Sequence, residues 1–156
     1  MDQQIIHTIV AVNNYLAAVD RRLISLLKLA DGQQQILKDL RDAAAGYKKT
    51  LVALTTTIRK PAFRTSFLTD IKTDNATVFA YITAVLLASI NGIQKLELQL
   101  KKSKTTSGGL FSKKTRSVTV DDELGIYVER MLHYDQSLSV AVHILEWYVA
   151  TSYFPS

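Results

Sequence analysis

The first thirty residues carry apolar side chains at alternating spacings of four and three residues. An α-helix makes one turn in about 3.6 residues, so only a helix brings positions with this spacing onto a single face. Such a stripe packs against other helices and leaves the remaining faces to water. The pattern therefore predicts a long amphipathic helix over residues 3–30. Its stripe consists of Ile5, Ile9, Val12, Leu16, Val19, Leu23, Leu26 and Ala30.

Similar helical spacing occurs in three further segments, which predicts helices over residues 33–59, 75–102 and 121–153. The third of the four helices is apolar over a wide arc, so we expect it to be well buried. Four long helices joined mostly by short connections predict an all-α fold, namely an antiparallel up-down-up-down four-helix bundle that forms one domain over residues 1–156. The three stripes are Ile36, Leu40, Ala43, Tyr47, Leu51, Leu54 and Ile58, then Val78, Phe79, Ile82, Val85, Leu86, Ile90, Ile93 and Leu96, then Leu124, Tyr127, Met131, Tyr134, Leu138, Ala141, Leu145 and Tyr148.

The periodicity stops between residues 103 and 119, where the chain becomes basic, rich in serine and threonine, and centred on two glycines. These features predict an extended, flexible basic loop over residues 103–119, between the third and fourth helices. Asp121, Asp122 and Glu123 follow the loop. We expect these acidic residues on the first turn of the fourth helix, where the helix dipole favours negative charge.

Few residues are available for catalysis or metal binding. The chain has no cysteine and three histidines, which excludes disulfides, thiolate nucleophiles and cysteine zinc sites. Two histidines stand at helical spacing from a glutamate, as Glu129 and His133 and as His143 and Glu146. Bundles of the di-iron type need glutamates from all four helices, however, and the first two predicted helices contain none. We therefore predict no enzymatic activity, no metal, no cofactor and no small-molecule substrate.

The net charge of +5 is concentrated in one segment. Residues 95–116 contain seven basic residues and one acidic residue, so the rest of the chain is close to neutral. Flexible lysines attract phosphates in a salt-dependent way, which indicates nucleic acid or an anionic membrane surface as a partner. The same segment is also typical of a solvated loop, and its spacing fits a two-part nuclear import signal, which matters only in a nucleated host. The anion-binding candidates are Lys101, Lys102, Lys104, Lys113, Lys114 and Arg116.

A second apolar stripe runs along the last predicted helix, on a different face from the first. One seam of a bundle does not need both faces. Either this helix packs under the connection that precedes the third helix, or the second face binds a protein partner or a second copy of the chain. We therefore predict a non-enzymatic interaction or assembly module, with binding of nucleic acid or anionic membrane as the alternative. The partner-binding candidates are Val140, Ile144, Trp147 and Phe154, with Leu110 and Phe111 as an apolar docking tip in the basic loop.

Residues 75–94 contain no charged side chain and are long enough to span a membrane. We expect a central bundle helix instead, because the other three predicted helices have polar faces that would be costly in lipid. The N-terminus lacks the basic start and the small-residue cleavage site of a secretory signal. A cytoplasmic location is the resulting expectation.

Overall fold

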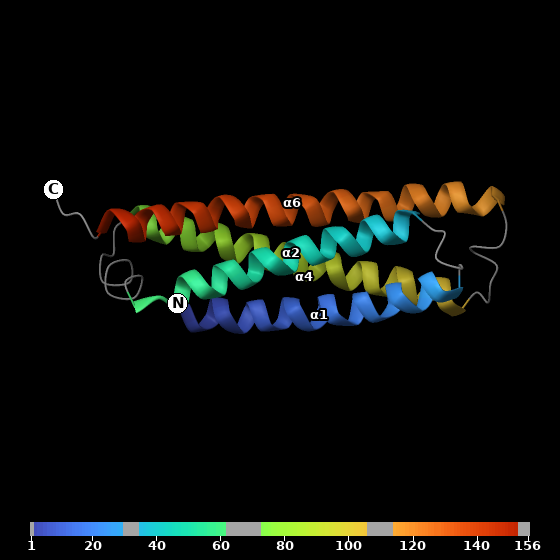
Figure 1. Ribbon diagram of the computed structural model, residues 1–156, viewed down its shortest axis with the longest axis horizontal. Helices are drawn as coiled ribbons and strands as arrows, with labels where there is room; N and C mark the ends of the chain where they lie inside the picture. The colour runs from blue at the N-terminus through green and yellow to red at the C-terminus, as the bar shows by residue number, and fades with distance from the viewer. Residues whose placement is uncertain (1, 30–34, 62–72, 106–113, 153–156) are drawn as a thin grey trace.

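Four helices make up the part of the chain that the structure, a computed structural model, describes (Figure 1). The described residues are 2–29, 35–61, 73–105 and 114–152. The helices are α1 (Asp2–Leu29), α2 (Gln35–Arg59), α4 (Thr73–Thr105) and α6 (Lys114–Ser152). No described residue belongs to a β-strand. Successive helices run in opposite directions, which confirms the predicted all-α, up-down-up-down four-helix bundle.

The neighbours in the bundle are not those that chain order alone would give. The most extensive packing joins α1 to α4 and α2 to α6, and the two members of each pair run in the same direction (Figure 1). Smaller contacts join α1 to α2 and α4 to α6, so α2 and α4 lie diagonally across the core although they follow one another in the chain.

The apolar stripes form the core. Leu16, Val19 and Leu23 of α1 are almost completely buried, and so are Leu51 and Leu54 of α2. Burial of one leucine contributes roughly 1.5–3 kcal/mol, so the four stripes together supply most of the driving force for folding. The stripe residues buried in α4 and α6 are Phe79, Ile82, Leu86, Ile93 and Leu96, then Leu124, Met131, Leu138, Ala141 and Leu145.

The predicted limits of the basic loop over residues 103–119 are wrong. Helix α4 continues to Thr105, and α6 already begins at Lys114. In the sequence, Val120 stands four residues before Leu124, at the spacing of the fourth stripe, which is consistent with an earlier start of this helix. The acidic residues at positions 121–123 consequently lie inside α6, and its first turn contains no acidic residue.

The expectation that the third helix is well buried is also wrong. α4 contains a segment, Ala76–Lys102, that is long and apolar enough to cross a membrane, yet only 33% of its most apolar window is buried. Tyr81, Leu87 and Leu98 are exposed on its outer side. A helix in a four-helix bundle gives only part of its circumference to the core, so a wide apolar arc leaves apolar side chains on the surface.

Candidate functional site

The outer face of α6 exposes three large apolar side chains close together. Val140 is 55% exposed, Ile144 is 44% exposed and Trp147 is 67% exposed. Their spacing of four and three residues places them on one helix face, where they line a shallow open depression with His143. We call Val140, His143, Ile144 and Trp147 the α6 face. The structure thus brings together three of the sequence-predicted partner-binding residues, whereas Phe154 lies outside the described residues.

Most of the chain around the α6 face is uncharged, although the exposed Glu146 directly precedes Trp147. Residues 136–145 of α6 contain no charged side chain, and neither do residues 50–58 of α2 or 75–94 of α4. The hydroxyl of Tyr134 abuts Gly92 of α4, and Asp135 abuts Gly46 of α2. These two contacts show which residues of α4 and α2 lie beside each part of α6. The uncharged segments of α2 and α4 therefore flank the C-terminal half of α6. Such an extended uncharged surface is unusual in a chain in which 21% of residues are charged.

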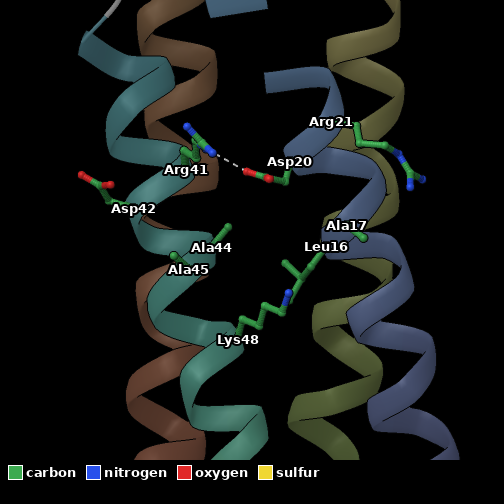
Figure 2. A pocket seen from close by; sticks show the side chains of 9 residues that line it. All are labelled: Leu16, Ala17, Asp20, Arg21, Arg41, Asp42, Ala44, Ala45 and Lys48. Atoms are coloured by element: carbon green, nitrogen blue, oxygen red, sulfur yellow. Dashed lines mark hydrogen bonds and ion pairs between the residues drawn. The ribbon is translucent and has the colours of Figure 1, made fainter. Parts of the chain in front are cut away.

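A groove between α1 and α2 is a second candidate, shown in Figure 2. Small side chains, among them Ala17 and Ala44, line it, and Arg41 Nε pairs with Asp20 Oδ1 across it at 2.9 Å. Lys48 reaches toward Leu16, whereas Asp42 and Arg21 point away from the gap (Figure 2). An exposed ion pair of this kind contributes little stability, and the other charged groups do not converge on a common point. The groove therefore holds no arrangement suited to catalysis.

Sequence reasoning missed this groove because its partners are on different helices. Asp20 and Arg41 are joined only once α1 and α2 pack side by side. The one available signal is a weaker second apolar stripe in the first helix, which Asp20 interrupts. This stripe consists of Ile6, Val10, Ala17, Ile24 and Leu27.

Two tyrosines occupy the middle of the bundle. The buried Tyr47 hydroxyl donates to Ser89 Oγ at 2.7 Å, and Ser89 Oγ donates to the carbonyl of Leu86 at 2.7 Å. The ring of Tyr134 lies 5.9 Å from that of Tyr47. Burial raises the pKa of the Tyr47 hydroxyl well above its ordinary value, and burial also raises the pKa of Tyr134, against the opposing effect of Arg130. The Tyr47 phenol, held protonated in this way, acts as a structural hydrogen-bond donor.

A smaller polar cluster joins α2 to α6. Thr50 Oγ1 donates to Asp135 Oδ1 and lies 3.4 Å from Ser139 Oγ. His143 is one turn away, but its Nδ1 is 2.7 Å from the backbone carbonyl of Ser139 and must donate to it. Its ring is therefore not placed to remove a proton from the Ser139 hydroxyl, and the cluster lacks the relay of a nucleophilic site. No group of three metal-ligating side chains occurs among the described residues.

The basic candidates gather at one end of the bundle, as far as the structure describes them. Lys101 and Lys102 are exposed near the end of α4, and the backbone of Lys104 follows on the same helix. Lys114 and Arg116 belong to the first turn of α6, which begins at the end of the bundle where α4 finishes (Figure 1). Lys113, Leu110 and Phe111 lie outside the described residues, so the docking tip stays a prediction.

Comparison with known proteins returns no relative for this chain. No family model matches it, no curated protein matches it, and no solved structure matches it.

Proposed function

We propose that this protein is a non-enzymatic assembly module that binds protein through the α6 face. The exposure of Trp147, beside Val140 and Ile144 on one face, is the observation that supports this function. Tryptophan is the residue most enriched among those that dominate binding energy at protein interfaces. A tryptophan left two-thirds exposed in a folded monomer gains more from a partner than from any contact in the bundle.

The chemistry around the α6 face favours protein over the other classes of partner. Interface cores are depleted in charged residues and enriched in aromatic ones, as this surface is. The hydrocarbon region of a membrane would have to cover uncharged polar side chains, including Gln136 and His143, that it cannot hydrogen-bond. Nucleic acid needs basic residues, and residues 136–145 provide none.

Sedimentation across a concentration series tests the proposal, with the fluorescence of Trp147, the single tryptophan, followed in parallel. We expect the mass to rise with concentration and the emission to shift to shorter wavelength as Trp147 becomes covered. Trp147→Ser should weaken association by about tenfold or more, because tryptophan hot spots contribute roughly 2 kcal/mol or more. Val52→Ser is the matched control, since Val52 is 56% exposed on the outer side of α2. A constant monomer mass at every concentration contradicts the proposal.

A second candidate function is supported by the basic end of the bundle. Exposed Lys101 and Lys102 lie in the last turns of α4, at the end of the bundle where Lys114 and Arg116 begin α6. The two helix ends concentrate positive charge there, and a phosphate-bearing surface, on nucleic acid or on membrane, is the partner that such charge attracts.

A further inference from the structure

We infer that the partner of the α6 face is a second copy of this chain, which docks antiparallel along α6 about a two-fold axis between His143 and Ile144. This inference rests on the proposed function and specifies its geometry. It is carried by the self-complementary spacing of the α6 face, by the charges within the paired segment and by the uncharged surface of α4 beside it.

The α6 face is symmetric about its own centre. Val140 and Trp147 are equally distant along the chain from the point between His143 and Ile144. A two-fold axis at that point places Val140 against Trp147 of the partner subunit and Ile144 against His143 of the partner subunit. Each large indole thus meets a small aliphatic side chain, which is the complementarity that an interface between identical surfaces requires.

The charges of α6 also fit this arrangement. With the axis at this point, residues 135–152 of the two copies overlap, so Glu129 and Arg130 fall outside the paired segment. Two charged residues remain inside it. Asp135 is hydrogen-bonded to Thr50 within its own bundle. Glu146 is rotated about 100° around the helix axis from Trp147, so it lies at the side of the α6 face rather than at its centre. Pairing therefore buries no uncompensated charge, and the antiparallel direction opposes the two helix dipoles, which a parallel pair would align.

One helix face is too small for a stable dimer, and α4 supplies the remaining surface. A standard interface covers about 800 Å² on each partner, whereas a large aromatic side chain covers only about 150–250 Å². Tyr134 of α6 contacts Gly92 of α4, and the two helices run in opposite directions (Figure 1). Eleven residues before Gly92 is Tyr81, and eleven residues after Tyr134 is Leu145, so Tyr81 and Leu145 lie at the same level of the bundle. Tyr81 is 44% exposed there, beside the α6 face. The uncharged surface of α4 is therefore continuous with the predicted interface.

Single cysteines test the geometry cleanly, because the chain has none of its own. A disulfide needs α-carbons within about 7 Å, a condition that only positions next to the axis meet with their own symmetry mates. We expect Ile144→Cys and His143→Cys to give a covalent dimer on mild oxidation. Gln136→Cys, at the edge of the paired segment, and Val52→Cys on α2 should stay monomeric under the same conditions. Circular dichroism confirms that each variant is helical before oxidation.

Mixed samples fix the direction of pairing. Val140→Cys and Trp147→Cys should cross-link to each other when the two variants are mixed, and far less when each is oxidised alone. A parallel pair would instead cross-link each of these variants to itself, which would overturn the inference. Concentration-dependent association that is lost in Trp147→Ser, without cross-links at Ile144, also overturns the antiparallel geometry while the proposed function stands. A monomer at all concentrations overturns both.

Discussion

At the scale of single residues, the centre of the core depends on specific contacts made by Tyr134 and Tyr47, and not on apolar packing alone. Tyr134 extends from α6 so that its hydroxyl abuts Gly92 on α4, and its Cζ is 3.2 Å from the position that a β-carbon at Gly92 would take. Its ring also packs against Tyr47, which reaches across the core to Ser89. These contacts fix the register of three helices at one level.

Gly92→Ala should destabilise the protein by about 1–2 kcal/mol. A methyl group at this position overlaps the Tyr134 hydroxyl, and overpacking of a core costs roughly 1–3 kcal/mol, which outweighs a gain in helix propensity of up to about 1 kcal/mol. Urea unfolding measures the effect. Gly125→Ala is the matched control, since nothing lies within 4 Å of its β-carbon position, and it should stabilise by roughly 0.5–1 kcal/mol. Tyr134→Phe should restore part of the loss in Gly92→Ala, and equal effects of the two alanine substitutions would contradict this account.

The raised pKa of Tyr47 predicts sensitivity to alkali. Below about pH 10 the hydroxyl is protonated in both the folded and the unfolded chain, so it does not make stability depend on pH. Above that pH the unfolded chain releases the proton and the folded chain retains it, so the free energy of unfolding falls as pH rises. Tyr47→Phe should cost about 1 kcal/mol near neutral pH, through the lost hydrogen bond to Ser89, and should make the alkaline decline shallower. Urea unfolding at a series of pH values measures both, and an unchanged alkaline slope would rule out this role for Tyr47.

At the scale of whole elements, the spacing of apolar residues was sufficient to predict the helices. The strict alternation from Ile5 to Leu26 gave α1 almost to its last residue, because a stripe of this regularity has no other way to be buried. The N-terminal end of α6 was less predictable. Lys114 to Thr119 contains a single large apolar residue, Val118, so a polar helical turn there resembles a loop.

The neighbour of each helix was not predictable from the stripes. A stripe identifies the face that turns inward, but it does not say which helix that face meets. Gly46 and Gly92 are the residues at which α6 approaches α2 and α4 closely, and in the sequence they look like ordinary helix-weakening glycines. The α6 face was only partly predictable, because its exposure depends on which helices pack against α6. A second apolar stripe showed that Val140, Ile144 and Trp147 exceed what one seam needs, whereas their exposure followed only from the packing.

At the scale of the molecule, charge is divided along the length of the bundle. Uncharged segments of all four helices occupy the half in which α1 begins and α6 ends, namely residues 3–19, 50–58, 75–94 and 136–145. The opposite half contains the charged groove between α1 and α2 and the basic ends of α4 and α6. The proposed protein-binding face therefore lies in one half, and the proposed anion-binding surface lies in the other.

This division predicts that the two ends act independently. The shortest of the helices has 25 residues and spans roughly 40 Å, far beyond the screening length of about 8–10 Å at physiological salt. Conversion of Lys101, Lys102, Lys104, Lys113, Lys114 and Arg116 to glutamine should abolish retention on heparin and leave self-association unchanged. Trp147→Ser should weaken self-association and leave retention on heparin unchanged. The matched control replaces six basic residues away from the basic end, Arg21, Lys48, Lys49, Arg59, Lys60 and Arg130, with glutamine.

The control separates a local site from general charge, because both sets of substitutions lower the net charge equally. Retention that survives the control, and that weakens steeply with salt in the unmodified chain, places the anion site at the basic end. Equal losses in the two variants show that net charge alone attracts heparin. No retention at low salt contradicts an anion site at the basic end. Because heparin and a partner chain would bind opposite halves, saturating heparin should also leave the sedimentation mass of the protein component unchanged. A heparin-induced loss of self-association would show that the two halves are coupled.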